Sequence, residues 1–119
     1  MLEDYHFASA RALTILSEIQ KLPCVVISAS SLEDLAEMKA QSSSKQTLLG
    51  NFDAIKLRVM PANEIEAMVK ESLLKGGKNG GYIFSDHHGE LPWQITFDQL
   101  DLLTKYLRKW GKYPLNFTL

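Results

Sequence analysis

Short apolar runs alternate with amphipathic helical patterns along the chain, and this alternation occurs three times. The apolar runs predict strands at residues 24–28, 46–49 and 82–85. No short hairpin turn joins these runs, so we expect the strands to be parallel and adjacent in chain order. The pattern therefore predicts an α/β fold built from three parallel βα units.

The helix after the first strand is expected to begin at Ser31, because Asp34 follows three residues later in a capping arrangement. Leu32, Leu35 and Ala36 would then face inward. The next helix is expected to begin near Pro61 and to end at the Gly76-Gly77 pair. Its apolar positions recur at helical spacing, at Ile65, Met68, Val69 and Leu73.

The last helix carries the clearest start signal in the chain. Thr96 and Gln99 have capping-box spacing, and Gly111 is expected to end the helix. Its apolar face is expected to cover the sheet and consists of Phe97, Leu100, Leu103, Leu107 and Trp110. A further amphipathic helix is expected around residues 12–19, preceded by a short segment that contains His6.

The glycine-rich segment 76–81 could be interpreted as a phosphate-binding loop. Its position disfavours that interpretation, because these glycines precede a strand and do not join a strand to a helix N-terminus. A helix C-terminal cap followed by a tight turn is the simpler prediction.

Length and composition limit the classes of protein to which the chain can belong. The 119 residues, 45% of them hydrophobic, are expected to form one domain over residues 1–119. The net charge of −1 gives no broad electrostatic surface for nucleic acid or an anionic membrane. No long apolar span or leader-like segment is visible, which makes a cytoplasmic protein the default expectation. The single cysteine, Cys24, lies in an apolar run and is expected to be a buried hydrophobe.

Polar residues follow the second and third predicted strands. In parallel α/β folds the binding and catalytic groups lie at the carboxyl ends of strands, which makes Asn51 and Asp53 candidate substrate-binding residues. The alternative is that both side chains only cap local backbone groups.

The segment Asp86-His87-His88 supplies a carboxylate and two imidazoles, which can transfer protons near neutral pH or bind a metal ion. Adjacent residues of an extended segment point in opposite directions, so only one of the two histidines can face a site. No HxxxH or CxxC spacing is present, and a metal site would need His6 as a distant partner.

Several segments, in this order, resemble the C-terminal part of the uroporphyrinogen decarboxylase superfamily, whose members are (β/α)8 TIM barrels. These segments are Leu49-Gly50-Asn51-Phe52-Asp53, Pro61-Ala62-Asn63-Glu64-Ile65, Gly80-Gly81-Tyr82-Ile83-Phe84-Ser85 and His88-Gly89. The resemblance implies an incomplete barrel, in which the N-terminal half with its tetrapyrrole-binding arginines and aspartate is absent. His88 and Asp86 are the candidate catalytic residues, and His6, Asn51 and Asp53 are the candidate substrate-binding residues. Of these, only His88 matches a site residue of the decarboxylases that the chain resembles.

Two segments resemble the methyltransferase branch, whose members exchange methyl groups with corrinoid proteins or cobalamin. His6-Phe7-Ala8-Ser9 is similar to that branch's His-x-Cys-Gly segment at a strand end, and residues 85–93 are similar to its last βα loop. Ala8 stands where zinc-dependent members have a metal-binding cysteine. We therefore expect no tightly bound zinc, since only His6 and His88 would remain as weak candidate ligands.

The leading expectation is a fragment of a corrinoid-dependent methyltransferase-type barrel that is inactive alone, with a corrinoid protein as the partner that this resemblance implies. One alternative is a relation to uroporphyrinogen decarboxylase itself, in porphyrin biosynthesis. Another is a non-catalytic interaction module or degenerate remnant. Three strands cannot close a barrel, so self-association or a chain that supplies the rest of the barrel is expected. Whether the chain is itself an enzyme stays open, because half of the family's site is missing.

Overall fold

The computed structural model of the chain describes every residue except 1–4, 9–15, 20–21, 23–24, 43–45 and 87–89. The strands form one parallel sheet in which the spatial order is the chain order. They are β1 (Tyr5–Ala8), β2 (Val25–Ser28), β3 (Gln46–Phe52) and β4 (Tyr82–Asp86). The three predicted strands are confirmed as parallel and adjacent. The structure adds β1, which the hydrophobic pattern did not predict because four residues that include His6 do not form an apolar run.

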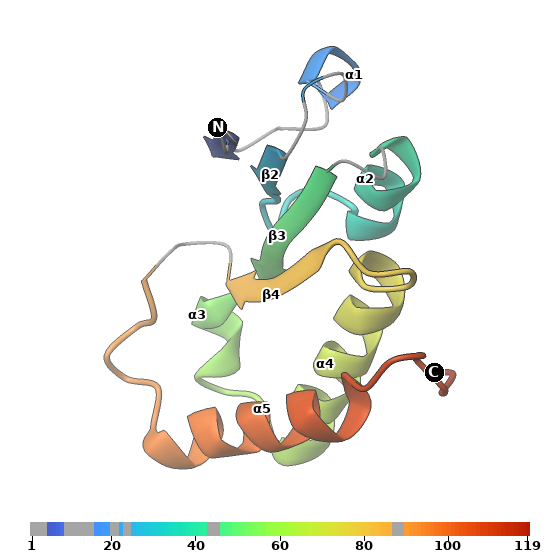
Figure 1. Cartoon of the computed structure of the whole chain (residues 1–119). Coiled ribbons are helices and arrows are strands. Elements are labelled where there is room, and N and C mark those ends of the chain that lie inside the picture. Colours follow the sequence, from blue (N-terminus) through green and yellow to red (C-terminus); the bar gives the residue numbers. More distant parts are fainter. Residues whose placement is uncertain (1–4, 9–15, 20–21, 23–24, 43–45, 87–89) are drawn as a thin grey trace.

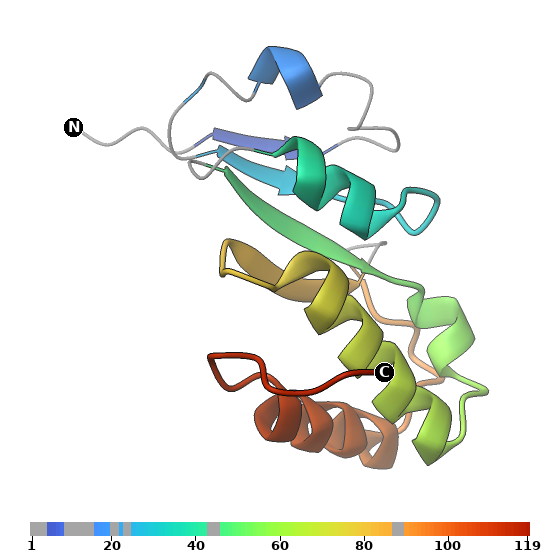
Figure 2. The ribbon, with the colours of Figure 1, turned by 90° about the vertical axis from the view of Figure 1, so that its right-hand side faces the viewer.

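The described residues also form helices α1 (Leu16–Ile19), α2 (Leu35–Gln41), α3 (Ala54–Leu57), α4 (Ala62–Gly76) and α5 (Phe97–Trp110). Figures 1 and 2 show α2 and α4 on the same side of the sheet. Among the helices of the described residues, none is long and apolar enough to cross a membrane. The architecture is an open α/β sheet that is consistent with part of a TIM barrel.

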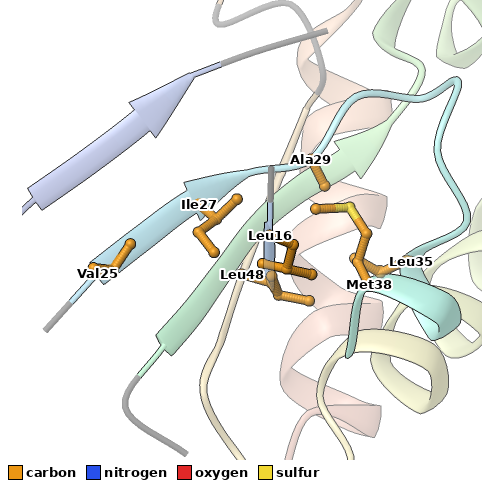
Figure 3. Close-up of a cluster of buried hydrophobic side chains, with 7 residues drawn as sticks. All are labelled: Leu16, Val25, Ile27, Ala29, Leu35, Met38 and Leu48. Carbon is orange, nitrogen blue, oxygen red and sulfur yellow. The ribbon is translucent and has the colours of Figure 1, made fainter. Parts of the chain in front are cut away.

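One part of the core lies between the first three strands and helices α1 and α2. Val25, Ile27 and Leu48 of the sheet are buried against Leu16 of α1 and Met38 of α2 (Figure 3). This contact explains the alternating burial of β2, because only every second residue faces the helices. The same alternation runs along β3.

The second part of the core joins β3 and β4 to α4. Phe52 and Phe84 stack with ring centroids 5.0 Å apart. Ile65 and Val69 of α4 are fully buried in this cluster, as the helical spacing predicted, and Leu103 of α5 closes it.

Helix α2 begins three residues later than predicted. Asp34, not Ser31, is its N-cap, and the Asp34 carboxylate accepts hydrogen bonds from the backbone N–H groups of Ala36 and Glu37. Leu32 is 76% exposed and Ala36 is also exposed, so the expectation that these two residues face inward was wrong, whereas Leu35 is buried as expected. A carboxylate at the N-cap also interacts favourably with the helix dipole, which favours Asp34 over Ser31.

Helix α5 has the predicted capping box, because Thr96 and Gln99 exchange hydrogen bonds between side chain and backbone. The Gln99 amide also donates to the Leu57 carbonyl at 2.9 Å and so ties α5 to α3. Contrary to expectation, α5 packs mainly on α4 and not on the sheet. Phe97 is 85% exposed, and the Trp110 indole is only half-buried and donates to Glu66 of α4.

The glycine-rich segment forms a helix end and a turn, as predicted. The Gly77 N–H caps α4 by donating to the Leu73 carbonyl at 2.8 Å. Gly80 and Gly81 have φ values of +80° and +68° immediately before β4, a region that favours glycine.

Candidate functional site

The amide of Asn51 holds the loop between β2 and α2. Its Nδ2 donates to the Ser30 carbonyl at 2.8 Å and to the Glu33 carbonyl at 2.9 Å. Both partners are carbonyl oxygens, so only the NH2 side of the amide fits this position. Asn51 therefore positions the β2–α2 loop through the NH2 group of its amide.

The Asp53 carboxylate caps helix α3. Its Oδ1 accepts from the backbone N–H groups of Ile55 at 2.9 Å and Lys56 at 3.4 Å. Asn51 and Asp53 therefore both make hydrogen bonds to nearby backbone groups, as the alternative interpretation of these residues predicted. These capping contacts do not exclude a ligand, because Asn51 and Asp53 also line a cavity.

A cavity of about 440 Å³ opens beside these two residues, a size within the range of small-molecule sites. It lies at the carboxyl ends of β2 and β3, between the start of α2, helix α3 and the outer part of α4. Its apolar lining comes from Leu32, Leu35, Phe52, Met60 and Met68. Asn51 and Asp53 therefore line the same cavity at the carboxyl ends of the strands.

The polar lining of the cavity is mainly acidic. It carries the carboxylates of Glu33, Asp34, Asp53 and Glu71 and the ammonium groups of Lys56 and Lys75. Glu71 and Lys75 form an ion pair at 2.7 Å, and the hydrogen bond to Glu71 raises the pKa of Lys75. Sequence reasoning missed the contributors from α4, because 18 residues or more separate them from Asp53 and no local motif marks them.

Asp86 is the last residue of β4 and lies opposite Phe52 in the strand pairing, while Ser85 lies opposite Asn51. The carboxylate of Asp86 is half-buried, and the Ser85 hydroxyl lies 3.5 Å from its Oδ1. Asp86 therefore sits at the same end of the sheet as Asn51 and Asp53.

The strand pairing places His6 elsewhere. His6 lies opposite Val26, and Val26 lies opposite Thr47. Asn51 comes four residues after Thr47 in β3, a rise of about 13 Å along a strand. The pairing does not bring His6 into the row of Asn51. His88 lies outside the described residues.

Within the described part of the chain, no three histidine, cysteine, aspartate or glutamate side chains lie close enough together to hold a metal ion. The zinc expectation remains a matter for experiment, because His88 is not among these residues.

Tyr82 is a residue of this region that the sequence reasoning placed only within a strand. Its hydroxyl donates a hydrogen bond to the carbonyl of Gly50, which links β4 to β3 next to Asn51. Burial raises the pKa of Tyr82 well above its ordinary value. The only sequence signal was a tyrosine at the amino end of an otherwise apolar strand.

The raised pKa of Tyr82 predicts a loss of stability in alkali. Above pH of about 10, the unfolded chain releases this proton while the folded chain retains it, so the stabilisation present below that pH decreases as the pH rises. The expected slope is up to about 1.4 kcal/mol per pH unit. Denaturant unfolding between pH 8 and about 11 should show this slope, and Tyr82→Phe should reduce it. An equal slope in Tyr82→Phe would contradict the assignment.

The sequence of the chain matches the uroporphyrinogen decarboxylase (URO-D) family over residues 4–110. The chain belongs to the uroporphyrinogen decarboxylase family. The match covers β1 to β4 and ends at the last residue of α5, so it includes every described helix and strand. No curated protein matches the chain significantly. Membership of the uroporphyrinogen decarboxylase family confirms the broad resemblance, and it does not distinguish decarboxylases from methyltransferases.

Proposed function

We propose that this uroporphyrinogen decarboxylase family chain corresponds to the C-terminal part of the barrel, of the corrinoid-dependent methyltransferase kind, and is inactive until the rest of the barrel is supplied. The observation that carries the proposal is the open parallel sheet. The described residues form four strands, whereas a closed (β/α)8 barrel has eight.

The proposed site lies at the carboxyl ends of the strands. Asn51 would present its Oδ1 as a hydrogen-bond acceptor to the substrate, since its Nδ2 is already used to hold the β2–α2 loop. Asp86 would orient the imidazole of His88, two residues further on, and together they would transfer a proton. Asp53 is a further proposed substrate-binding residue, as is His6, which would contact the substrate from outside the row of Asn51.

The methyltransferase assignment rests on the likeness of residues 6–9 and 85–93 to that branch of the family. A corrinoid would be presented by a partner protein and would supply or accept the methyl group. In this chain Ala8 replaces the expected cysteine, which removes the thiolate of a three-ligand zinc site.

Two parallel titrations test the proposed branch. Methylcobalamin added to the purified chain is expected to change its visible spectrum on binding, while uroporphyrin is expected to leave its Soret band unchanged. The reverse result would favour the decarboxylase relation. A response to neither compound would favour a non-catalytic interaction module. Asp86→Asn should weaken the cobalamin response, and Asp98→Asn, on the exposed start of α5, is the matched control.

Elemental analysis tests the metal assignment separately. We expect less than about 0.1 zinc per purified chain, because two imidazoles leave the ion under-coordinated. One zinc per chain that is lost in His6→Ala or His88→Ala would contradict this expectation and would favour a metal-dependent methyltransferase.

A further inference from the structure

The face of the sheet opposite the helices has the composition of a barrel interior. Val25, Ile27 and Leu48 point towards α1 and α2, so alternation places their strand neighbours on the other face. These neighbours are Val26, Ser28, Thr47 and Leu49, and in β4 Ile83 and Ser85. Three of these side chains are apolar, three carry a hydroxyl group, and none is charged. The branched residues among them, Val26, Thr47, Leu49 and Ile83, are of the kind that fills the layers inside parallel barrels, whereas a water-facing surface usually carries charged groups.

No helix of the described residues covers this face. Ile83 is 46% exposed although it lies within β4, while Val26, Thr47 and Leu49 on the same face are half-buried. Parallel sheets are almost always covered on both faces, so a parallel sheet with one open face is an incomplete unit.

The two edge strands of the sheet are complementary. In the described residues β1 pairs only with β2, and β4 pairs only with β3. All strands run in the same direction, and the edge strands have similar lengths of four and five residues. The outer edge of β4 in one copy can therefore continue into β1 of another copy as a parallel pair.

The exposed area of the chain agrees with a missing interface. Its accessible surface is 7540 Å², about 1,000 Å² more than the roughly 6,500 Å² expected of a compact monomer of 13.4 kDa. One partner in a specific interface of standard size buries about 800 Å².

We propose that two copies of this chain close one eight-stranded parallel barrel. The β4 strand of each copy pairs with β1 of the other, which makes two equivalent seams around a two-fold axis parallel to the barrel axis. The four described strands of each copy together give the eight of a (β/α)8 barrel, with the helices outside and Val26, Leu49 and Ile83 of both copies inside. This proposal rests on one part of the proposed function, namely that the chain forms part of a barrel. The partner that completes the barrel is a second copy of the same chain.

Solution mass is the first test. Sedimentation equilibrium is expected to give twice the chain mass of 13.4 kDa, and a monomer at all concentrations up to about 100 μM, a concentration at which specific interfaces are occupied, would overturn the proposal. Ile83→Lys would place two ammonium groups inside the closed barrel and is expected to weaken dimerisation at least 100-fold. The control is Val59→Lys, which makes the same kind of change at a residue 81% exposed outside the sheet and is expected to leave the dimer intact.

A dimer that Ile83→Lys does not weaken would overturn the barrel geometry, because its interface would lie elsewhere. Cross-linking tests that geometry without a disruptive charge. In a Cys24→Ala background, which removes the only cysteine of the chain, Ala8→Cys and Ser85→Cys place thiols near the ends of the two edge strands. Mixing the two single-cysteine proteins under oxidising conditions should give a disulfide-linked heterodimer in higher yield than either protein alone. Equal yields would contradict the seam.

The mass and cross-linking measurements involve no ligand, so they succeed or fail independently of the cobalamin and uroporphyrin titrations. A barrel dimer that binds neither compound would disprove the proposed methyltransferase function and leave this inference intact. A monomer that binds methylcobalamin would support the proposed methyltransferase function and would disprove the barrel dimer.

Discussion

Replacing Gly50 by alanine is expected to lower the free energy of unfolding by about 3 kcal/mol, from backbone strain and steric overlap together. Gly50 has a φ of +139°, a conformation that residues with a side chain rarely adopt. A Cβ atom here would lie 2.6 Å from the Ala29 carbonyl oxygen and 3.3 Å from the Ala29 Cβ. Backbone cannot move away as a flexible side chain can, so the contact between the ends of β2 and β3 would have to open.

Gly80→Ala is the matched control for this experiment. Gly80 also has a positive φ, but a Cβ atom at this position would meet nothing within 4 Å. Its substitution should cost only the conformational part, about 1 kcal/mol. Denaturant unfolding of both variants therefore separates backbone conformation from close approach. Equal losses would show that the β2–β3 contact is looser than described.

Asn51→Asp is expected to destabilise the chain by about 3 kcal/mol at neutral pH, and Asn51→Ala by about 2 kcal/mol. Asn51→Ala removes the hydrogen bonds from the Asn51 amide to the Ser30 and Glu33 carbonyls, at a cost of about 1 kcal/mol each, although the Ser30 carbonyl keeps the backbone N–H of Glu33 as a donor. Asn51→Asp also sets a carboxylate against these two oxygens, which adds repulsion. Denaturant unfolding measures the loss, and amide hydrogen exchange should rise in residues 31–34 of the β2–α2 loop.

Asn63→Asp makes the same chemical change at an exposed position in the first turn of α4. Because a negative charge is favourable near a helix N-terminus, this control is expected to be neutral or slightly stabilising. If Asn51→Asp were equally harmless, the amide would not be holding the loop, and its main role would be sought in ligand binding instead.

The sequence predicted the main helices and strands wherever a local signal coincided with burial. The strand at 82–85 is apolar, Ile65 and Val69 recur at helical spacing, and Thr96 has its capping partner. Each of these signals is contained within one element. This is why they survive without any knowledge of the tertiary structure.

The parts that could not be predicted depend on contacts between distant segments. Strand β1 is four residues long and is defined by its pairing with β2. The position of α5 depends on packing against α4, which overrides the hydrophobic face that made Phe97 look buried. At the candidate site, spacing placed Asn51 and Asp53 together, but nothing local shows that Glu71 and Lys75 line the same cavity.

The neighbour relations of the sheet also bear on how the chain folds during synthesis. Because the spatial order of the strands is the order of translation, β2 can pair with β1, β3 with β2 and β4 with β3 as each emerges from the ribosome. No described strand must be held unpaired while a later one is made and inserted between two others. Each completed βα unit therefore provides the edge on which the next unit docks, and the nascent chain never has to reopen a sheet that has already formed.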